Sequence, residues 1–366
     1  MASQMVGTKK ACVVGGTGFV ASLLIKLLLE KGYAVNTTVR DPDNQKKIPH
    51  LVTLQKLGDL KIFQADLIDE RSFDYPFAGC KLVFQVATPV NFASQDPEND
   101  MIKPAIQGVL NVLKACAKAK TIKRVVLTSS PAAVSINTLN RTDLVMTERD
   151  WTDTEFLSSA KPPTWGYPAS KTLAEKTAWR YAEENNIDLV TVIPSLMTGP
   201  SLTPDVPSSI ELATALISGI KSEPNAMALC CQARSPSRMW KTVPELAKFL
   251  HKRNPEFQVP TDFGDCPSKA KLIISSEKLI NEGFSFKFGI EEIFDQTVEY
   301  LKDKGLLNST HKMLFVYCDS GHPGSFDGWL TQPLEPPCAL FVHHPQWEKT
   351  DRPPYVHRVL HKYSRR

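Results

Sequence analysis

Short apolar runs alternate with longer segments of helical periodicity over about the first 200 residues of the chain. The apolar runs predict six strands, which lie at residues 10–15, 33–40, 61–67, 81–88, 124–130 and 189–195. The clearest helical segments between them lie at residues 18–31, 101–120 and 167–185. Strands that alternate with helices are typical of βαβ units and a parallel sheet. The pattern therefore predicts an α/β fold with a doubly wound parallel sheet, of the Rossmann type, over residues 1–200.

The pattern weakens after residue 200, and we expect a smaller, incomplete substrate-binding part over residues 201–308. Helices are predicted there at residues 210–219, 243–251 and 290–304. Residues 220–240 show no usable period, which predicts a linker. Beyond residue 308 the composition shifts, and six of the eight histidines fall in the last 56 residues without paired ligand spacing. A disordered tail is therefore expected over residues 309–366.

Composition narrows the class of protein. With 366 residues, 42% of them hydrophobic and 22% charged, the chain should bury a sizeable core. The formal net charge of +4 is mild and spread along the chain, so a nucleic-acid partner is not indicated. No apolar run is long enough for a membrane span, and the start lacks the features of a secretory signal. The eight cysteines include no Cys-x-x-Cys, which favours a reduced, cytoplasmic enzyme without metal or disulfides.

Polar and glycine residues gather where the predicted strands end. Ligands of doubly wound sheets bind at the carboxyl ends of the strands. The residues at the first five ends are Gly15 to Gly18, Arg40, Asp66, Val86 to Thr88, and Ser130. This alignment predicts one shared site.

The loop Gly15-Gly16-Thr17-Gly18 lies between the first predicted strand and the helix that follows it. Its spacing is Gly15-x-x-Gly18-x-x-Ala21, and the alanine still permits close packing of helix on strand. The N–H groups at the start of a helix, with the positive end of its dipole, suit a pyrophosphate. We therefore predict a dinucleotide site here, with a plain tight turn as the alternative.

The second predicted strand ends in Arg40 and not in an acidic residue. A carboxylate at this place binds the ribose 2′-hydroxyl of NAD, whereas an arginine accommodates the 2′-phosphate of NADP. Lys46 and Lys47 would add charge for the same phosphate. Asp41 argues against this, unless it turns away as a loop cap. The sequence favours NADP(H), and a solvated Arg40 is the alternative.

Tyr167 precedes Lys171 by four residues on a predicted helix, which places both side chains on one face. Pro168 is compatible with the first turn of that helix. A free phenol has a pKa near ~10, and a nearby ammonium favours the phenolate. The pair is a candidate acid/base unit, although the same spacing also occurs on solvated helix faces.

Ser130 ends the fifth predicted strand, and its hydroxyl would hold a substrate oxygen beside Tyr167. Ser129 is the rival, because alternation along a strand sends the two hydroxyls to opposite faces. Pro131 follows directly, and it biases Ser130 toward an extended backbone.

Taken together, these residues resemble the extended short-chain dehydrogenase/reductase family and, within it, the plant flavonoid reductases. The resemblance covers about residues 8–219 and 241–308. Its most specific stretches are residues 11–29, 36–47, 86–90, 165–176, 183–194 and 243–306. Between residues 217 and 242 the family carries several tens of residues more, and residues 309–366 extend past its usual end.

The resemblance implies a role for each site residue. The pyrophosphate would be bound by Gly15, Thr17, Gly18, Phe19 and Val20. The 2′-phosphate would contact Arg40 and Lys47, and the adenine would be bordered by Asp66 and Leu67. The nicotinamide ribose would lie against Val86, Ala87, Thr88 and Pro89. Tyr167 would exchange the proton, Lys171 would lower its pKa and hold the ribose, and Ser130 would position the substrate oxygen.

The implied reaction is the NADPH-dependent reduction of an anthocyanidin, such as cyanidin, to a 2,3-cis-flavan-3-ol, such as epicatechin. One alternative is a reductase of a dihydroflavonol or another aromatic carbonyl. Another is an NADP-binding protein whose shortened pocket neither excludes water nor holds a flavonoid. The expected partner is a small flavonoid molecule, while the preferred anthocyanidin and the oligomeric state stay open.

Overall fold

The structure is a computed structural model that describes residues 9–137, 144–218, 243–260, 262 and 272–307. Its main sheet has six parallel strands in the order β3-β2-β1-β4-β5-β7, which confirms the predicted doubly wound fold. The strands are β1 (Lys10–Val14), β2 (Ala34–Val39), β3 (Leu60–Gln64), β4 (Leu82–Gln85), β5 (Arg124–Thr128) and β7 (Leu189–Val192).

Each of these strands begins within one residue of its predicted start and ends one to three residues before its predicted end. The residues at the carboxyl ends leave the hydrogen-bonded ladder and form the loops of the site. The strand pattern in the sequence therefore continues into these loop residues, although the hydrogen-bonded strand has already ended.

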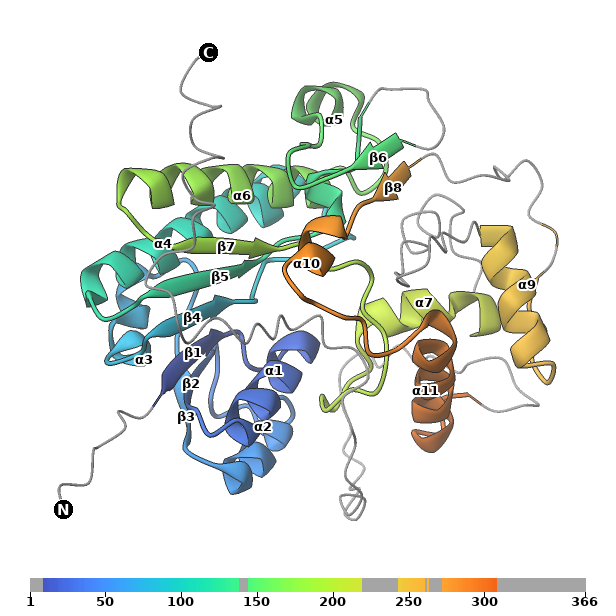
Figure 1. Cartoon of the computed structure of the whole chain (residues 1–366), viewed down its shortest axis with the longest axis horizontal. Coiled ribbons are helices and arrows are strands. Elements are labelled where there is room, and N and C mark those ends of the chain that lie inside the picture. The colour runs from blue at the N-terminus through green and yellow to red at the C-terminus, as the bar shows by residue number, and fades with distance from the viewer. Residues whose placement is uncertain (1–8, 138–143, 219–242, 261, 263–271, 308–366) are drawn as a thin grey trace.

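Helices cover both faces of the main sheet (Figure 1). On one face lie α3 (Asp74–Phe77), α4 (Lys103–Ala119) and α6 (Gly166–Glu184). On the other face lie α1 (Phe19–Glu30) and α2 (Pro49–Leu54). The alternation along β1 explains this, because Cys12 and Val14 pack under α4, whereas Ala11 and Val13 pack under α1. Short helical turns occur at Gln55–Leu57, Glu70–Phe73, Glu98–Ile102 and Pro131–Ala133.

A third group of helices packs at the carboxyl side of the sheet (Figure 1). It consists of α7 (Ser208–Ser218), α9 (Val243–Arg253) and α11 (Ile290–Asp303), and α10 (Glu277–Asn281) precedes α11. Their buried side chains form one hydrophobic core, here called the helical cluster, in which Ile210, Leu250 and Leu301 are fully buried. All six helices predicted from periodicity are therefore present, each within two residues of its predicted bounds.

Two features near the site were not predicted. The strands β6 (Leu144–Met146) and β8 (Leu272–Ile274) pair in parallel as a small second sheet, and α5 (Thr154–Ala160) follows β6. Strands of three residues carry too little alternation to be recognised, and these two lie far apart in the sequence. The predicted linker at residues 220–240 and the predicted tail at residues 309–366 lie outside the described residues.

Candidate active site

The glycine loop is held closely between β2 and the segment after β4. Gly15 has a φ of +91°, in the left-handed region, and a Cβ added there would lie 2.6 Å from the Cβ of Ala87. A Cβ at Gly16 would lie 2.3 Å from Oγ1 of Thr37. The N–H groups of both glycines donate to the carbonyl of Thr38, at 3.1 and 2.9 Å. Neither position has room for a side chain.

The helix that follows the loop, α1, begins without a hydrogen bond from a capping side chain. Gly18 is the N-cap of α1 and has an extended backbone, and the first turn contains no acidic residue. The N–H groups of a first turn lack partners within the helix, so the loop and the uncapped turn form a cradle that fits a pyrophosphate. The side chain of Phe19 packs against the helical cluster. Phe19 would therefore contact a phosphate through its backbone, like its neighbours Thr17 and Val20.

The end of β2 presents its arginine to solvent. Arg40 is exposed, and its carbonyl accepts a hydrogen bond from Nε2 of Gln64 at 3.2 Å, which fixes the backbone there. Asp41 turns into the following loop, where its Oδ1 accepts from the N–H of Asp43 at 3.0 Å. Asp41 is thus a loop cap, and it does not take the place of the carboxylate that an NAD site uses.

Lys47 lies near this edge but already has a partner. Its Nζ is 3.7 Å from the carboxylate of Asp205, in the loop before α7, and both side chains are exposed. An exposed pair of this kind contributes little to stability, so the ammonium can exchange one anionic partner for another.

The loops after β3 and β4 lie beside the glycine loop. Asp66 is exposed, and its Oδ1 accepts from the N–H of Ile68 at 3.1 Å. The carbonyl of Leu67 accepts from Nδ2 of Asn111 at 2.8 Å, which anchors this turn to α4. After β4, the N–H of Ala87 donates to the carbonyl of Val14 at 3.1 Å.

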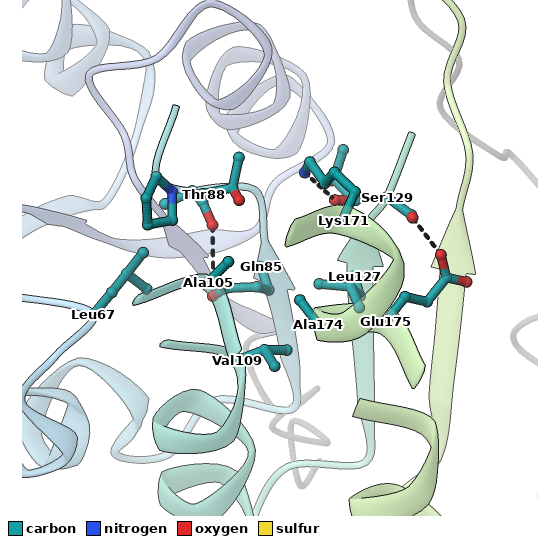
Figure 2. Close-up of a pocket in the computed structure, with 13 residues that line it drawn as sticks. Leu67, Gln85, Thr88, Ala105, Val109, Leu127, Ser129, Lys171, Ala174 and Glu175 are labelled. Carbon is teal, nitrogen blue, oxygen red and sulfur yellow. Dashed lines mark hydrogen bonds between the residues drawn. The ribbon is translucent and has the colours of Figure 1, made fainter. Parts of the chain in front are cut away.

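Residues of these loops and of α6 line a pocket (Figure 2). Figure 2 shows Leu67 at one end of the pocket and Glu175 at the other, with Thr88 and Lys171 between them. Residues after β3, β4 and β5 thus line one pocket together with the first half of α6. The glycine loop, Arg40 and Ser130 are not among its lining residues, so the single site expected at the carboxyl ends stays a prediction.

Tyr167 lies in the first turn of α6, next to the end of β5. The side chain of Ser130 lies beside its phenol, and the centroid of the Phe92 ring lies 5.2 Å from that of the Tyr167 ring. Ser130 has the extended backbone expected before a proline, and its Oγ also accepts from the N–H of Ala132 at 3.2 Å. Of the two rival serines, Ser130 is therefore the one beside Tyr167.

The pKa of Tyr167 does not follow the sequence expectation. We expected the Lys171 ammonium to lower it, but burial raises the pKa of Tyr167, and the side chain of Ser130 opposes this rise. Lys171 donates from Nζ to the carbonyl of Thr128, at 3.3 Å. The side chain of Ser130, and not the Lys171 ammonium, is therefore the group that lowers the pKa of Tyr167 here.

Lys171 and Glu175 are both buried and lie on successive turns of α6 (Figure 2). Burial lowers the pKa of Lys171 to about 8, and the Glu175 carboxylate opposes this. Burial also raises the pKa of Glu175, which is hydrogen-bonded to the rival serine, Ser129, and to Nε1 of Trp179. Ser129 therefore fixes Glu175, the carboxylate that acts on the pKa of Lys171.

Sequence reasoning missed three residues of this site. Glu175 has the spacing of a solvated helix face but is 4% exposed. Gln85 is the last residue of β4 and lines the pocket, and its buried Oε1 is among the described side-chain atoms without a hydrogen-bond partner. Phe92 lies in a loop without periodicity. A signal existed only for Glu175, which follows Lys171 at the i,i+4 spacing of a charged pair.

The described residues contain neither a metal-binding cluster nor a membrane-spanning helix. No group of three or more His, Cys, Asp or Glu side chains that could hold a metal occurs in the described ranges. None of the helices in the described ranges is long and apolar enough to cross a membrane. Cys12, Cys80 and Cys116 are buried thiols, and the other five cysteines lie outside the described part of the chain.

Comparisons with known proteins agree with this geometry. The model of the NAD dependent epimerase/dehydratase family matches residues 11–254. An anthocyanidin reductase ((2S)-flavan-3-ol-forming) of Vitis vinifera is 63% identical, over 84% of this chain and 100% of its own length. A bifunctional dihydroflavonol 4-reductase/flavanone 4-reductase of Pyrus communis is 41% identical, over 82% of this chain and 92% of its own length.

Two solved structures are similar over most of the chain. Vestitone reductase from alfalfa (Medicago sativa) has a TM-score of 0.67 at 34% identity, covering 81% of this chain and 99% of its own. The yeast methylglyoxal/isovaleraldehyde reductase Gre2, complexed with NADPH, has a TM-score of 0.67 at 26% identity with the same coverage.

The alignment with the Vitis reductase also indicates that this chain lacks a segment that the relative has, here called the missing segment. It runs over 344 positions, whereas 84% of the 366 residues is about 307. The relative therefore has several tens of residues for which this chain has no counterpart. The family match and the identity to the Vitis reductase agree, and the chain belongs to the NAD dependent epimerase/dehydratase family, in its anthocyanidin reductase branch.

Proposed function

We propose that the protein is an NADPH-dependent oxidoreductase that reduces anthocyanidins to 2,3-cis-flavan-3-ols in flavonoid biosynthesis. The observation that carries this proposal is the position of Ser130 beside the phenol of Tyr167, at the same edge of the sheet as the glycine cradle. The relatives named above support the substrate class. The substrate is a small flavonoid molecule, and we place the protein in the cytoplasm, where buried thiols stay reduced.

The residues at the carboxyl edge fit NADP(H). The cradle of Gly15, Thr17 and Gly18 would bind the pyrophosphate, together with the first N–H groups of α1 at Phe19 and Val20. Arg40 and Lys47 would pair with the 2′-phosphate. The adenine would lie between Asp66 and Leu67, and the nicotinamide ribose against Val86, Ala87, Thr88 and Pro89. When bound, the cofactor supplies a hydride to the electron-poor ring of the substrate.

The chain's own residues orient the substrate and manage the proton. Ser130 would hold a substrate oxygen next to the phenol of Tyr167, which gives or takes the proton there. Lys171, fixed by the carbonyl of Thr128, would hold the ribose and favour the phenolate once the ribose and substrate are in place. The helical cluster would form the substrate-binding part at residues 201–308.

Arg40 should determine the preference for NADPH over NADH. Replacing it by leucine (Arg40→Leu) removes the charge that would pair with the 2′-phosphate. We expect the Kd of NADPH to rise roughly tenfold to a hundredfold, since a hydrogen bond to a charged group contributes about 1.5–3 kcal/mol. The Kd of NADH should stay within about twofold, as measured by fluorescence titration. Arg180→Leu, at an exposed position on α6, is the matched control. Equal losses for both cofactors would show that Arg40 does not contact the 2′-phosphate.

The pH dependence should depend on Glu175. The ammonium form of Lys171 is the active one, and its pKa of about 8 places the basic limb of the kcat/KM profile near that pH. The Glu175 carboxylate raises the pKa of Lys171, so Glu175→Gln should lower this pKa and move the basic limb to lower pH. Glu183→Gln, exposed on the same helix, should leave the profile unchanged. A limb that stays in place in Glu175→Gln contradicts the coupling.

The assay that tests the function compares two substrates. Purified protein is supplied with NADPH and either cyanidin or dihydroquercetin, and NADPH consumption is followed together with cofactor binding. Turnover of cyanidin supports the proposal, and turnover of dihydroquercetin alone selects a dihydroflavonol reductase, as in the Pyrus relative. Cofactor binding without any turnover selects a catalytically impaired protein, as the missing segment would permit.

A further inference from the structure

Phe92 presents an exposed aromatic ring directly beside the tyrosine of the site. The centroids of the Phe92 and Tyr167 rings are 5.2 Å apart, and the ring planes meet at 55°. Phe92 is nevertheless 54% exposed, and Val90, two residues earlier in the same loop, is 48% exposed. Exposed apolar side chains next to a candidate catalytic tyrosine are typical of a binding surface for an apolar ligand.

The loop that carries Phe92 is anchored on both sides of the ring. The N–H of Asn91 donates to Sδ of Met101 at 3.3 Å, and its Oδ1 accepts from the N–H of Ala93 at 3.2 Å. Further along, Pro97 packs so closely on α6 that a Cβ at Gly166 would lie 2.3 Å from the Cβ of the proline. The backbone of this loop is therefore held in place, in part by the contact of Pro97 with Gly166, the residue before Tyr167. Phe92 is exposed because this fixed backbone holds its ring at the surface.

We propose that Phe92 is a positioning and specificity residue, whose ring stacks on the fused rings of the flavonoid substrate, with Val90 extending the apolar wall. This inference rests on the proposed function. The face of a phenyl ring is electron-rich, and the anthocyanidin ring system is planar and electron-poor, so an offset stack is favourable. The position of Phe92 beside Tyr167 would hold the substrate ring next to the phenol. Phe92 takes no part in proton transfer.

The test is a KM-against-kcat comparison of three substitutions at this position. We expect Phe92→Ala to raise the KM for cyanidin roughly tenfold or more, because it removes both the buried area and the stacking partner. Phe92→Leu should retain part of the area and raise KM less, and Phe92→Tyr should restore it. The kcat, the basic limb of the pH profile and the Kd of NADPH should stay close to those of the parent. Tyr75→Ala, which removes a ring that is 82% exposed on α3, is the control.

Two results would overturn the inference. An unchanged KM with a reduced kcat would mean that the ring acts only on Tyr167, and equal effects of Leu and Tyr would mean that aromaticity is irrelevant. If the parent protein does not turn over cyanidin, the proposed function fails, and direct titration of cyanidin onto the protein with NADP⁺ decides the stacking separately. Weaker binding of cyanidin to Phe92→Ala than to the parent then supports stacking on Phe92, and equal binding refutes it.

Discussion

Replacing Tyr167 by phenylalanine is expected to lower the kcat of cyanidin reduction by roughly 10²–10⁴-fold, the usual contribution of a positioned acid or base. The substitution removes one hydroxyl and keeps the ring that packs against Phe92. It also leaves the pyrophosphate cradle untouched. The Kd of NADPH should therefore stay within about twofold, and the thermal midpoint should change little.

The companion substitution is Ser130→Ala. It removes the hydroxyl that opposes the burial-driven rise in the pKa of Tyr167, so this pKa should rise further. We expect a smaller loss of kcat than in Tyr167→Phe. Ser158→Ala, at an exposed position on α5, is the matched control. If Tyr167→Phe keeps most of the parent's kcat, the phenol is not the proton donor and the assignment of the site is wrong.

Replacing Gly15 by alanine should abolish cofactor binding at concentrations that saturate the parent. The φ of +91° costs an L-residue roughly 1–2 kcal/mol, and the overlap with Ala87 adds about 1–3 kcal/mol. The loop can relieve the overlap only by moving away from β4, which displaces the N–H groups that would bind the pyrophosphate. NADPH titration and urea unfolding measure the two effects.

Gly32→Ala separates the backbone cost from the packing cost. Gly32 has a φ of +75° at the end of α1, but a Cβ there would meet nothing within 4 Å. This variant should lose about 1 kcal/mol of stability and keep the Kd of NADPH. Equal cofactor affinities in the two variants would contradict the close approach of the glycine loop to Ala87.

Local periodicity was enough to predict the main sheet and the longer helices that flank it, α1, α4 and α6, but not the short helices α2 and α3. Runs such as residues 10–15 and 124–130 are apolar because both faces of a parallel strand are covered, and this pattern is visible without any partner strand. The helices at residues 18–31 and 290–304 could be predicted from apolar residues at helical spacing, a pattern that is also visible without any packing partner. The small β6–β8 sheet could not be predicted, because its pairing depends on segments that are distant in the chain.

Within the site, the sequence by itself determined which chemical groups are present. It determined the glycine loop, the arginine at the end of the second strand, and the spacing of Tyr167 and Lys171, since these depend on neighbours a few residues away. The tertiary structure alone decided that Ser130 reaches the phenol while Ser129 holds Glu175, and that burial raises the pKa of Tyr167. Desolvation depends on what covers a group, and the covering residues come from elements far apart in the chain.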